Sequence, residues 1–248
     1  MASSAQPDLL SRILRHERLI VAGGVGLLAL LSWLFVLGGA GMDAAMLGAM
    51  HSPPFGALLI MWWVMMAAMM LPSAAPAILL YGRVREMRNR DSTFAASWFF
   101  LIGYLAVWLL FSLAAANVQW LLTGPSMTLP GRWSEGTVLL VAGLYQLSPL
   151  KAACVRQCRS PAQFISRHWQ GGWRGAVRLG ILHGAYCVGC CWMLMALLFV
   201  GGVMNVLWIA GIAILILLEK TVPAGQLIPR ISGVLMAGAG LWLLAGAV

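Results

Sequence analysis

The sequence predicts an all-α, polytopic transmembrane bundle of seven helices, with the N-terminus inside and the C-terminus outside. Hydrophobic residues make up 61% of the 248 residues, and charged residues make up only 9%, whereas a typical soluble domain has about 25%. Apolar stretches long enough to cross a bilayer recur along the chain. This composition excludes an ordinary soluble enzyme, a disordered chain and a nucleic-acid-binding protein, despite the formal net charge of +9.

Each span is predicted from an apolar run, and a spanning helix needs about 20 mostly apolar residues. The first run is long enough to span and has no clear cleavage site after it, so we expect a retained helix. The second contains Pro72 and Pro76, and the fourth is short, so either one could be kinked. The predicted spans are residues 19–37, 55–80, 94–116, 136–149, 179–200, 203–218 and 231–247.

The basic residues alternate between the predicted connections and thereby orient the helices. Fifteen of the sixteen Lys and Arg residues fall at one set of ends, and only Arg132 falls at the other. Cytoplasmic connections collect Lys and Arg. We therefore predict one membrane domain over residues 1–248, with a basic cytoplasmic N-terminus at 1–18 and a basic cytoplasmic loop at 150–178.

The strongest functional pattern is a cysteine cluster in the fifth predicted span. On a helix with about 100° per residue, His183, Cys187, Cys190 and Cys191 lie within one narrow sector. Counting from Arg178, Cys187 lies about 14 Å into a core about 30 Å thick. A histidine at that depth is expected to face protein, water or a ligand. Thiolate and imidazole donors suit Cu(I) and Zn(II), so the pattern predicts a soft-metal site.

Two other interpretations of this helix stay open. Residues 187–190 form a Cys-x-x-Cys pair, which is also typical of thiol redox chemistry. A membrane thiol-disulfide oxidoreductase would pass electrons from Cys187 and Cys190 to a quinone. Alternatively, the cysteines are small apolar residues that only pack helices together, as in a non-catalytic partner subunit.

A second cysteine pair follows the fourth span. Cys154 and Cys158 are four residues apart, so they share a face if the chain is helical there. Neighbouring basic residues favour thiolates. One ion could not reach both this surface pair and a mid-membrane Cys187 unless the chain near Cys154 dips inward. We therefore expect either one joint site or a second, relay site.

Methionine is abundant, with fifteen residues in the chain. Thioethers bind Cu(I), which places copper ahead of zinc, although Met also fills gaps in apolar cores. A group at 42, 46 and 50 in the first external connection would begin a soft-ligand path. The second span contributes four possible supporting ligands, which are Met65, Met66, Met69 and Met70.

Three sequence blocks resemble a known family. They are residues 65–73 (MMAAMMLPS), 148–161 (SPLKAACVRQCRSP) and 183–195 (HGAYCVGCCWMLM), within a likeness that covers about 62–220. The chain is similar to the bacterial integral membrane proteins of domain of unknown function 2182, which are described as metal-binding. Ser148 and Met193 stand where that pattern favours Thr and Ala. The resemblance implies a metal-binding protein of the bacterial inner membrane and no settled activity.

Together these patterns predict a copper-binding membrane protein that acts in uptake, export or delivery of the metal. Its predicted partners are the lipid bilayer, the metal ion and a metallochaperone or cuproenzyme. The polar pair Glu219 and Lys220, at the cytoplasmic end of the sixth span, is expected to be an interfacial ion pair. The predicted metal ligands are His183, Cys187, Cys190, Cys191, Cys154, Cys158, Met65, Met66, Met69 and Met70.

Overall fold

The computed structural model describes residues 6–39, 54–88, 93–122, 131–222 and 226–246. Within these segments the regular structure is entirely helical, which confirms the all-α prediction. The methionine group at 42, 46 and 50 lies outside the described residues. The described helices are α1 (Gln6–Leu37), α3 (Phe55–Arg88), α4 (Thr93–Leu122), α5 (Arg132–Gln146), α6 (Pro149–Arg159), α7 (Pro161–His168), α8 (Gly172–Ala196), α9 (Leu198–Gly201), α10 (Val206–Thr221) and α11 (Leu227–Ala245).

Fewer helices meet the requirements for a membrane span than the seven predicted. In the described part of the chain, five helices are long and apolar enough, and a sixth results if α5 and α6 form one bent span. The predicted span at 203–218 corresponds to α10, which has 16 residues and is about 24 Å long. That length falls short of a hydrocarbon core of about 30 Å.

The predicted basic loop at 150–178 is instead largely helical. Ser148 is the N-cap of α6, its side chain accepts a hydrogen bond from the Lys151 backbone N–H, and Pro149 occupies the first turn. Both features favour a helix start. The axes of α5 and α6 differ by 63°, and α6 then packs against α8. The chain therefore turns back onto the cysteine-bearing helix.

Small residues allow α8 to pack closely on α4. A Cβ atom at Gly180 would collide with the backbone carbonyl of Phe100, and one at Gly103 would collide with that of Val177. Glycine at both positions therefore lets the two backbones approach, as is common between membrane helices. This contact holds α8 against α4.

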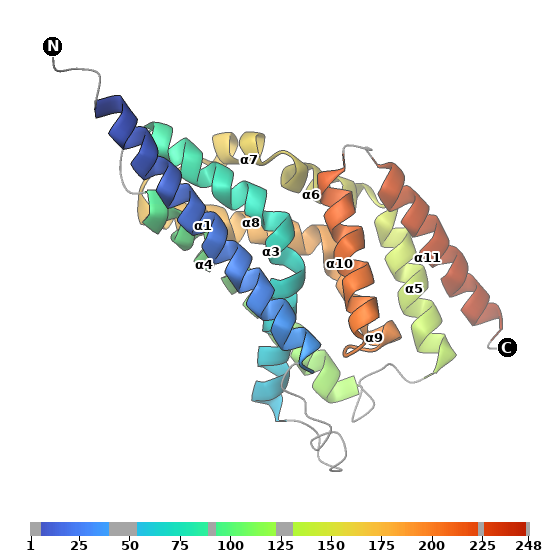
Figure 1. Cartoon of the computed structure of the whole chain (residues 1–248). Coiled ribbons are helices and arrows are strands. Elements are labelled where there is room, and N and C mark those ends of the chain that lie inside the picture. The colour runs from blue at the N-terminus through green and yellow to red at the C-terminus, as the bar shows by residue number, and fades with distance from the viewer. Residues whose placement is uncertain (1–5, 40–53, 89–92, 123–130, 223–225, 247–248) are drawn as a thin grey trace.

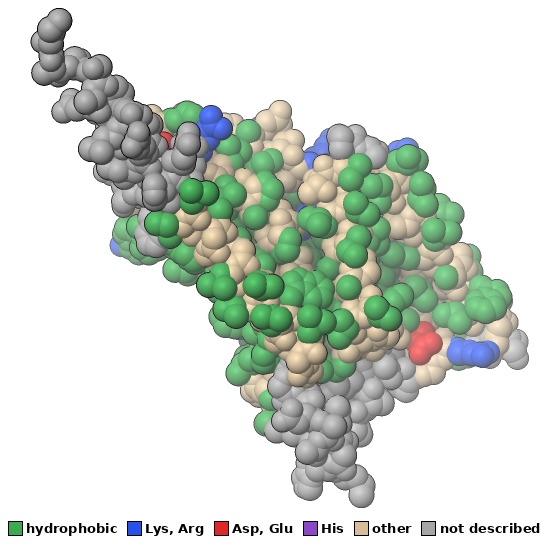
Figure 2. All heavy atoms as spheres, viewed as in Figure 1, with side chains coloured by type: hydrophobic (Ala, Val, Ile, Leu, Met, Phe, Trp, Pro, Cys, Tyr) green, Lys and Arg blue, Asp and Glu red, His purple; other side chains and the backbone are tan. Residues whose placement is uncertain are grey.

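The helices form two groups on either side of α8. On one side α1 packs against α3 and α4, and on the other α5 packs against α11 (Figure 1). Figure 2 shows hydrophobic side chains across the middle of the visible face, while Lys and Arg appear near its two edges. That distribution suits a protein surrounded by lipid at mid-height.

Candidate metal-binding site

Helix α8 buries all four of its predicted ligands. His183, Cys187, Cys190 and Cys191 are each at most 3% exposed. The thiols of Cys190 and Cys191 lie 3.1 and 2.9 Å from the backbone carbonyl oxygen of Cys187. Because that carbonyl belongs to the preceding turn, both thiols point back along the helix toward Cys187. The spacing therefore gathers the sulfur atoms within one turn of α8.

Cys187 contacts polar groups from two other helices. Its Sγ atom lies 3.1 Å from the Tyr104 hydroxyl on α4 and 3.0 Å from Nζ of Lys220 on α10. Lys220 Nζ also lies 3.2 Å from the Ser73 hydroxyl oxygen. Cys187 is thus surrounded by hydrogen-bonding groups within an apolar core, a setting that suits an anionic sulfur.

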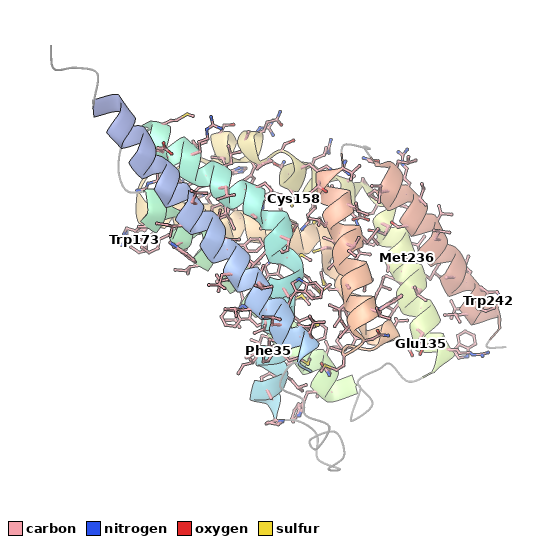
Figure 3. All side chains as sticks on the ribbon, in the orientation of Figure 1. Phe35, Glu135, Cys158, Trp173, Met236 and Trp242 are labelled. Carbon is pink, nitrogen blue, oxygen red and sulfur yellow. The ribbon has the colours of Figure 1, made fainter. Side chains whose placement is uncertain are left out.

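The second cysteine pair joins this cluster rather than staying apart. The Cys158 side chain on α6, labelled in Figure 3, comes close to those of Cys187 and Cys190 on α8. Cys154 Sγ lies against Gly189, 3.0 Å from where a Cβ atom would be. The bend between α5 and α6 directs α6 inward, so all five cysteines belong to one neighbourhood. Cys154 and Cys158 are half-buried, whereas the α8 cysteines are buried.

Among the predicted methionine ligands, Met70 contacts the cluster. Its Sδ atom lies 3.9 Å from Cys191 Sγ and 3.8 Å from Lys220 Nζ. Met65, Met66 and Met69 are also buried in the hydrophobic core. Met69 lines a separate apolar cavity together with Trp33 and Ala213, so its side chain contributes to packing between α1, α3 and α10.

His183 lies in an aromatic enclosure one turn before Cys187. Its ring is 5.8, 5.9 and 5.3 Å from the rings of Phe100, Tyr104 and Phe164, measured between centroids. The Nδ1 atom is buried and has no hydrogen-bond partner within the described part of the chain. An unsatisfied buried nitrogen is costly in a folded protein. A ligand of this nitrogen would remove that cost.

The expected ion pair between Glu219 and Lys220 is wrong. Glu219 Oε2 instead lies 2.6 Å from Nζ of Lys151, and its Oε1 accepts a hydrogen bond from the Gln146 side chain. Both Glu219 and Lys220 are buried within the protein. Neighbours on a helix point about 100° apart, so Lys220 faces the thiols while Glu219 faces α6. Sequence reasoning therefore missed Lys220 and Tyr104 as members of the site, although a lysine within an apolar helix is a functional signal.

The chemistry of these side chains fits a soft cation. The five cysteines are free thiols, and thiolates with thioethers select Cu(I). Among the residues that the structure describes, no three His, Cys, Asp or Glu side chains stand together as ligands of one ion. The close sulfur pairs are instead Cys191 with Met70, and Cys158 with Cys187 or Cys190. A Cu(I) ion held by this cluster would therefore rely on few thiols and on thioether sulfur.

Comparison with known proteins gives one match. No curated protein and no solved structure matches the chain. A family model described as PpoB2, copper chaperone, matches residues 59–243 and so covers the predicted ligands from Met65 to Cys191. This match supports the copper expectation drawn from the sulfur donors. The chain belongs to the PpoB2 copper chaperone family.

Proposed function

We propose that this protein is a multi-pass protein of the bacterial inner membrane that binds Cu(I) and delivers it to a protein partner. The family match supports a copper-related role, and the long apolar helices support a membrane location. The resemblance to domain of unknown function 2182 points the same way. Within this proposal the orientation has the N-terminus inside and the C-terminus outside, as the distribution of Lys and Arg predicts.

The observation that carries the proposal is the meeting of sulfur atoms from three helices. Met70 Sδ on α3 lies 3.9 Å from Cys191 Sγ, Cys154 Sγ on α6 lies against Gly189 of α8, and Cys158 on α6 comes close to Cys187 and Cys190. Packing alone does not require that thiols from distant segments contact one another. Cu(I), however, is bound preferentially by thiolate and thioether sulfur. We therefore propose that Cu(I) is held by two of these sulfur atoms at a time, with Cys187, Cys190 and Cys191 as the ligands from α8 and Met70 as a supporting ligand.

His183 is a further candidate ligand. It lies on the same face of α8 as Cys187, four residues earlier, and its buried Nδ1 atom has no hydrogen-bond partner among the described residues. An imidazole nitrogen is a suitable ligand for copper and for zinc. The aromatic rings around it restrict its orientation and exclude water. This enclosure would keep the nitrogen available for the metal.

Lys220 supplies a positive charge that the proposed complex needs. A Cu(I) ion held by two thiolates has a net charge of −1, and isolated charges are costly in an apolar interior. The Lys220 ammonium, 3.0 Å from Cys187 Sγ, would balance that charge. The ammonium is itself buried, so the lysine and the copper complex would stabilise each other.

The graded burial of the cysteines suggests how the metal is passed on. Cys154 and Cys158 are half-buried on α6, whereas the α8 cysteines are buried. An incoming partner would meet the α6 thiols first, and ligands would then be exchanged one at a time toward or from Cys187. In this account α6 is a relay between the cluster and a metallochaperone or cuproenzyme. Met65, Met66 and Met69 would continue the soft-donor lining along α3.

Metal analysis of the purified protein tests the proposal. Protein purified in detergent under reducing conditions, loaded with Cu(I) and desalted, should retain near-stoichiometric copper by elemental analysis, and Cys187→Ser should lose it. All five cysteines belong to the cluster, so the matched controls are histidines. His183→Gln should lower copper content, while His168→Gln on α7 should not. Zinc in place of copper would overturn the metal assignment. A trapped disulfide between Cys187 and Cys190 in metal-free protein would instead support the oxidoreductase.

A further inference from the structure

A cavity of about 280 Å³ lies away from the thiol cluster, between α6, the α5–α6 turn and the first turns of α11. Four of its lining residues are basic, namely Lys151, Arg156, Arg159 and Arg230. The copper proposal uses none of them. In Figure 2, Lys and Arg side chains are visible at this edge of the molecule. The cavity therefore combines a partly open volume with concentrated positive charge.

The described residues that line this cavity include four basic side chains and no acidic one. Lys151 forms an ion pair with Glu219, which lies behind the lining. Arg159 Nε donates a hydrogen bond to the backbone carbonyl of Glu219, 2.7 Å away. Arg230 donates to the neutral side chain of Gln226, at 3.3 Å. Arginine pairs readily with phosphate oxygens through parallel N–H donors, so the cavity suits a phosphate-bearing anion.

The other wall of the cavity is apolar and reaches the outer surface. Leu147 at the end of α5 and Val234 on α11 both line it, and they are 44% and 61% exposed. Leu147 is the C-cap of α5, and Val234 lies within α11, which is long and apolar enough to span a membrane. A free phosphate ion would gain nothing from this wall. A phospholipid would place its headgroup among the arginines and an acyl chain along Leu147 and Val234.

We propose that this cavity is a binding site for the headgroup of an anionic phospholipid, held by Arg156, Arg159 and Arg230. Basic cavities between helices at the cytoplasmic edge of a membrane are suited to such headgroups. The inference rests on the membrane location in the proposed function but not on copper binding. Its ligand is recognised by charge and by the apolar wall together, so it is a lipid and not inorganic phosphate.

Lipid selectivity of the full chain tests this site. Protein in neutral detergent would be titrated with phosphatidylglycerol or phosphatidylcholine and the bound lipid counted by native mass spectrometry. We expect phosphatidylglycerol to bind at least about tenfold more tightly, and Arg156→Gln with Arg230→Gln to remove about that factor. The control pair, Arg83→Gln with Arg132→Gln, has the same change in net charge outside the cavity. It should keep the selectivity.

Three results would overturn the inference: equal binding of the two lipids, equal loss in both double variants, or displacement of phosphatidylglycerol by millimolar inorganic phosphate. Helix content by circular dichroism shows whether each variant is folded. If a double variant fails to fold, the single variant Arg230→Gln, at an exposed position, replaces it. Copper content of the same samples separates the two proposals, because loss of lipid selectivity with copper retained rejects only this site.

Discussion

The Nζ atom of Lys220 lies 3.0 Å from the Sγ atom of Cys187, in the interior of a helix bundle. The two residues come from α10 and α8, and both are buried. A lysine at such a position needs an anionic or strongly polar partner, because a lone buried ammonium is costly. The surrounding acceptors are a thiol, a hydroxyl and a thioether. The buried ammonium of Lys220 is therefore stabilised most when the neighbouring sulfur atoms carry negative charge.

Replacement of Lys220 tests that relationship. Lys220→Met shortens the side chain by one atom and removes its charge, so the charge of a copper–thiolate complex would remain unbalanced in an apolar interior. We expect the affinity for Cu(I) to fall by about tenfold or more. Competition with a chromophoric Cu(I) chelator measures the effect. The control is Lys151→Met, which should not weaken copper binding directly, because Lys151 pairs with Glu219. An unchanged Cu(I) affinity in Lys220→Met would contradict the proposed charge-balancing role of Lys220.

Glu219 is expected to matter for stability more than for copper. Its carboxylate pairs with Lys151 and accepts a hydrogen bond from Gln146. Removal of one partner of a buried ion pair costs about 3–5 kcal/mol, so Glu219→Leu should lower the melting temperature in detergent markedly. The control Glu135→Gln changes an acid outside this network. The double variant Lys151→Met with Glu219→Leu should recover much of the loss; no recovery would mean that the pair is not the cause.

Local periodicity was sufficient to predict the buried sulfur face of α8 but not its neighbours. The spacing of His183, Cys187, Cys190 and Cys191 depends only on helix geometry, which any helical segment shares. The approach of Cys158 depends on the 63° bend after α5. Pro149 and the preceding serine favour a helix start there, but no residue pattern gives the direction of the new helix. The contact between the two groups of cysteines therefore depends on tertiary structure, which the local sequence pattern does not determine.

The orientation of Glu219 and Lys220 and the number of spans could not be predicted from the sequence for similar reasons. Consecutive residues on a helix do not face each other, and which of Glu219 and Lys220 faces the thiols depends on the rotation of α10 in the bundle. Seven spans were predicted, whereas five or six helices of the described residues meet the length and apolarity requirements, because mean apolarity does not determine whether a run continues as one straight helix. The apolar run at 203–218 forms a helix of only 16 residues, which begins after the N-cap Asn205 and ends at Thr221.

The close contact between α4 and α8 gives a further test. In Gly180→Val, side-chain atoms would meet the Phe100 backbone carbonyl on α4, and backbone cannot yield as a flexible side chain can. We expect a loss of about 1–3 kcal/mol in the free energy of unfolding and lower copper retention, because α8 carries the ligands. Gly211→Val on α10 has open space around its Cβ position and serves as the control. Equal stability of the two variants would show that the glycine contact is not needed.

Met70 offers the sharpest test of thioether ligation. Met70→Leu removes the sulfur 3.9 Å from Cys191 Sγ while it nearly conserves volume, which usually costs less than about 1.5 kcal/mol. Met61 is equally buried on the same helix and is not a proposed ligand, so Met61→Leu is the matched control. We expect Met70→Leu to lower Cu(I) affinity several-fold, measured by chelator competition at constant protein fold, and Met61→Leu to leave it unchanged. If both variants bind Cu(I) like the parent protein, Met70 packs beside the cluster without ligating the metal, and the ligands are thiols and imidazole alone.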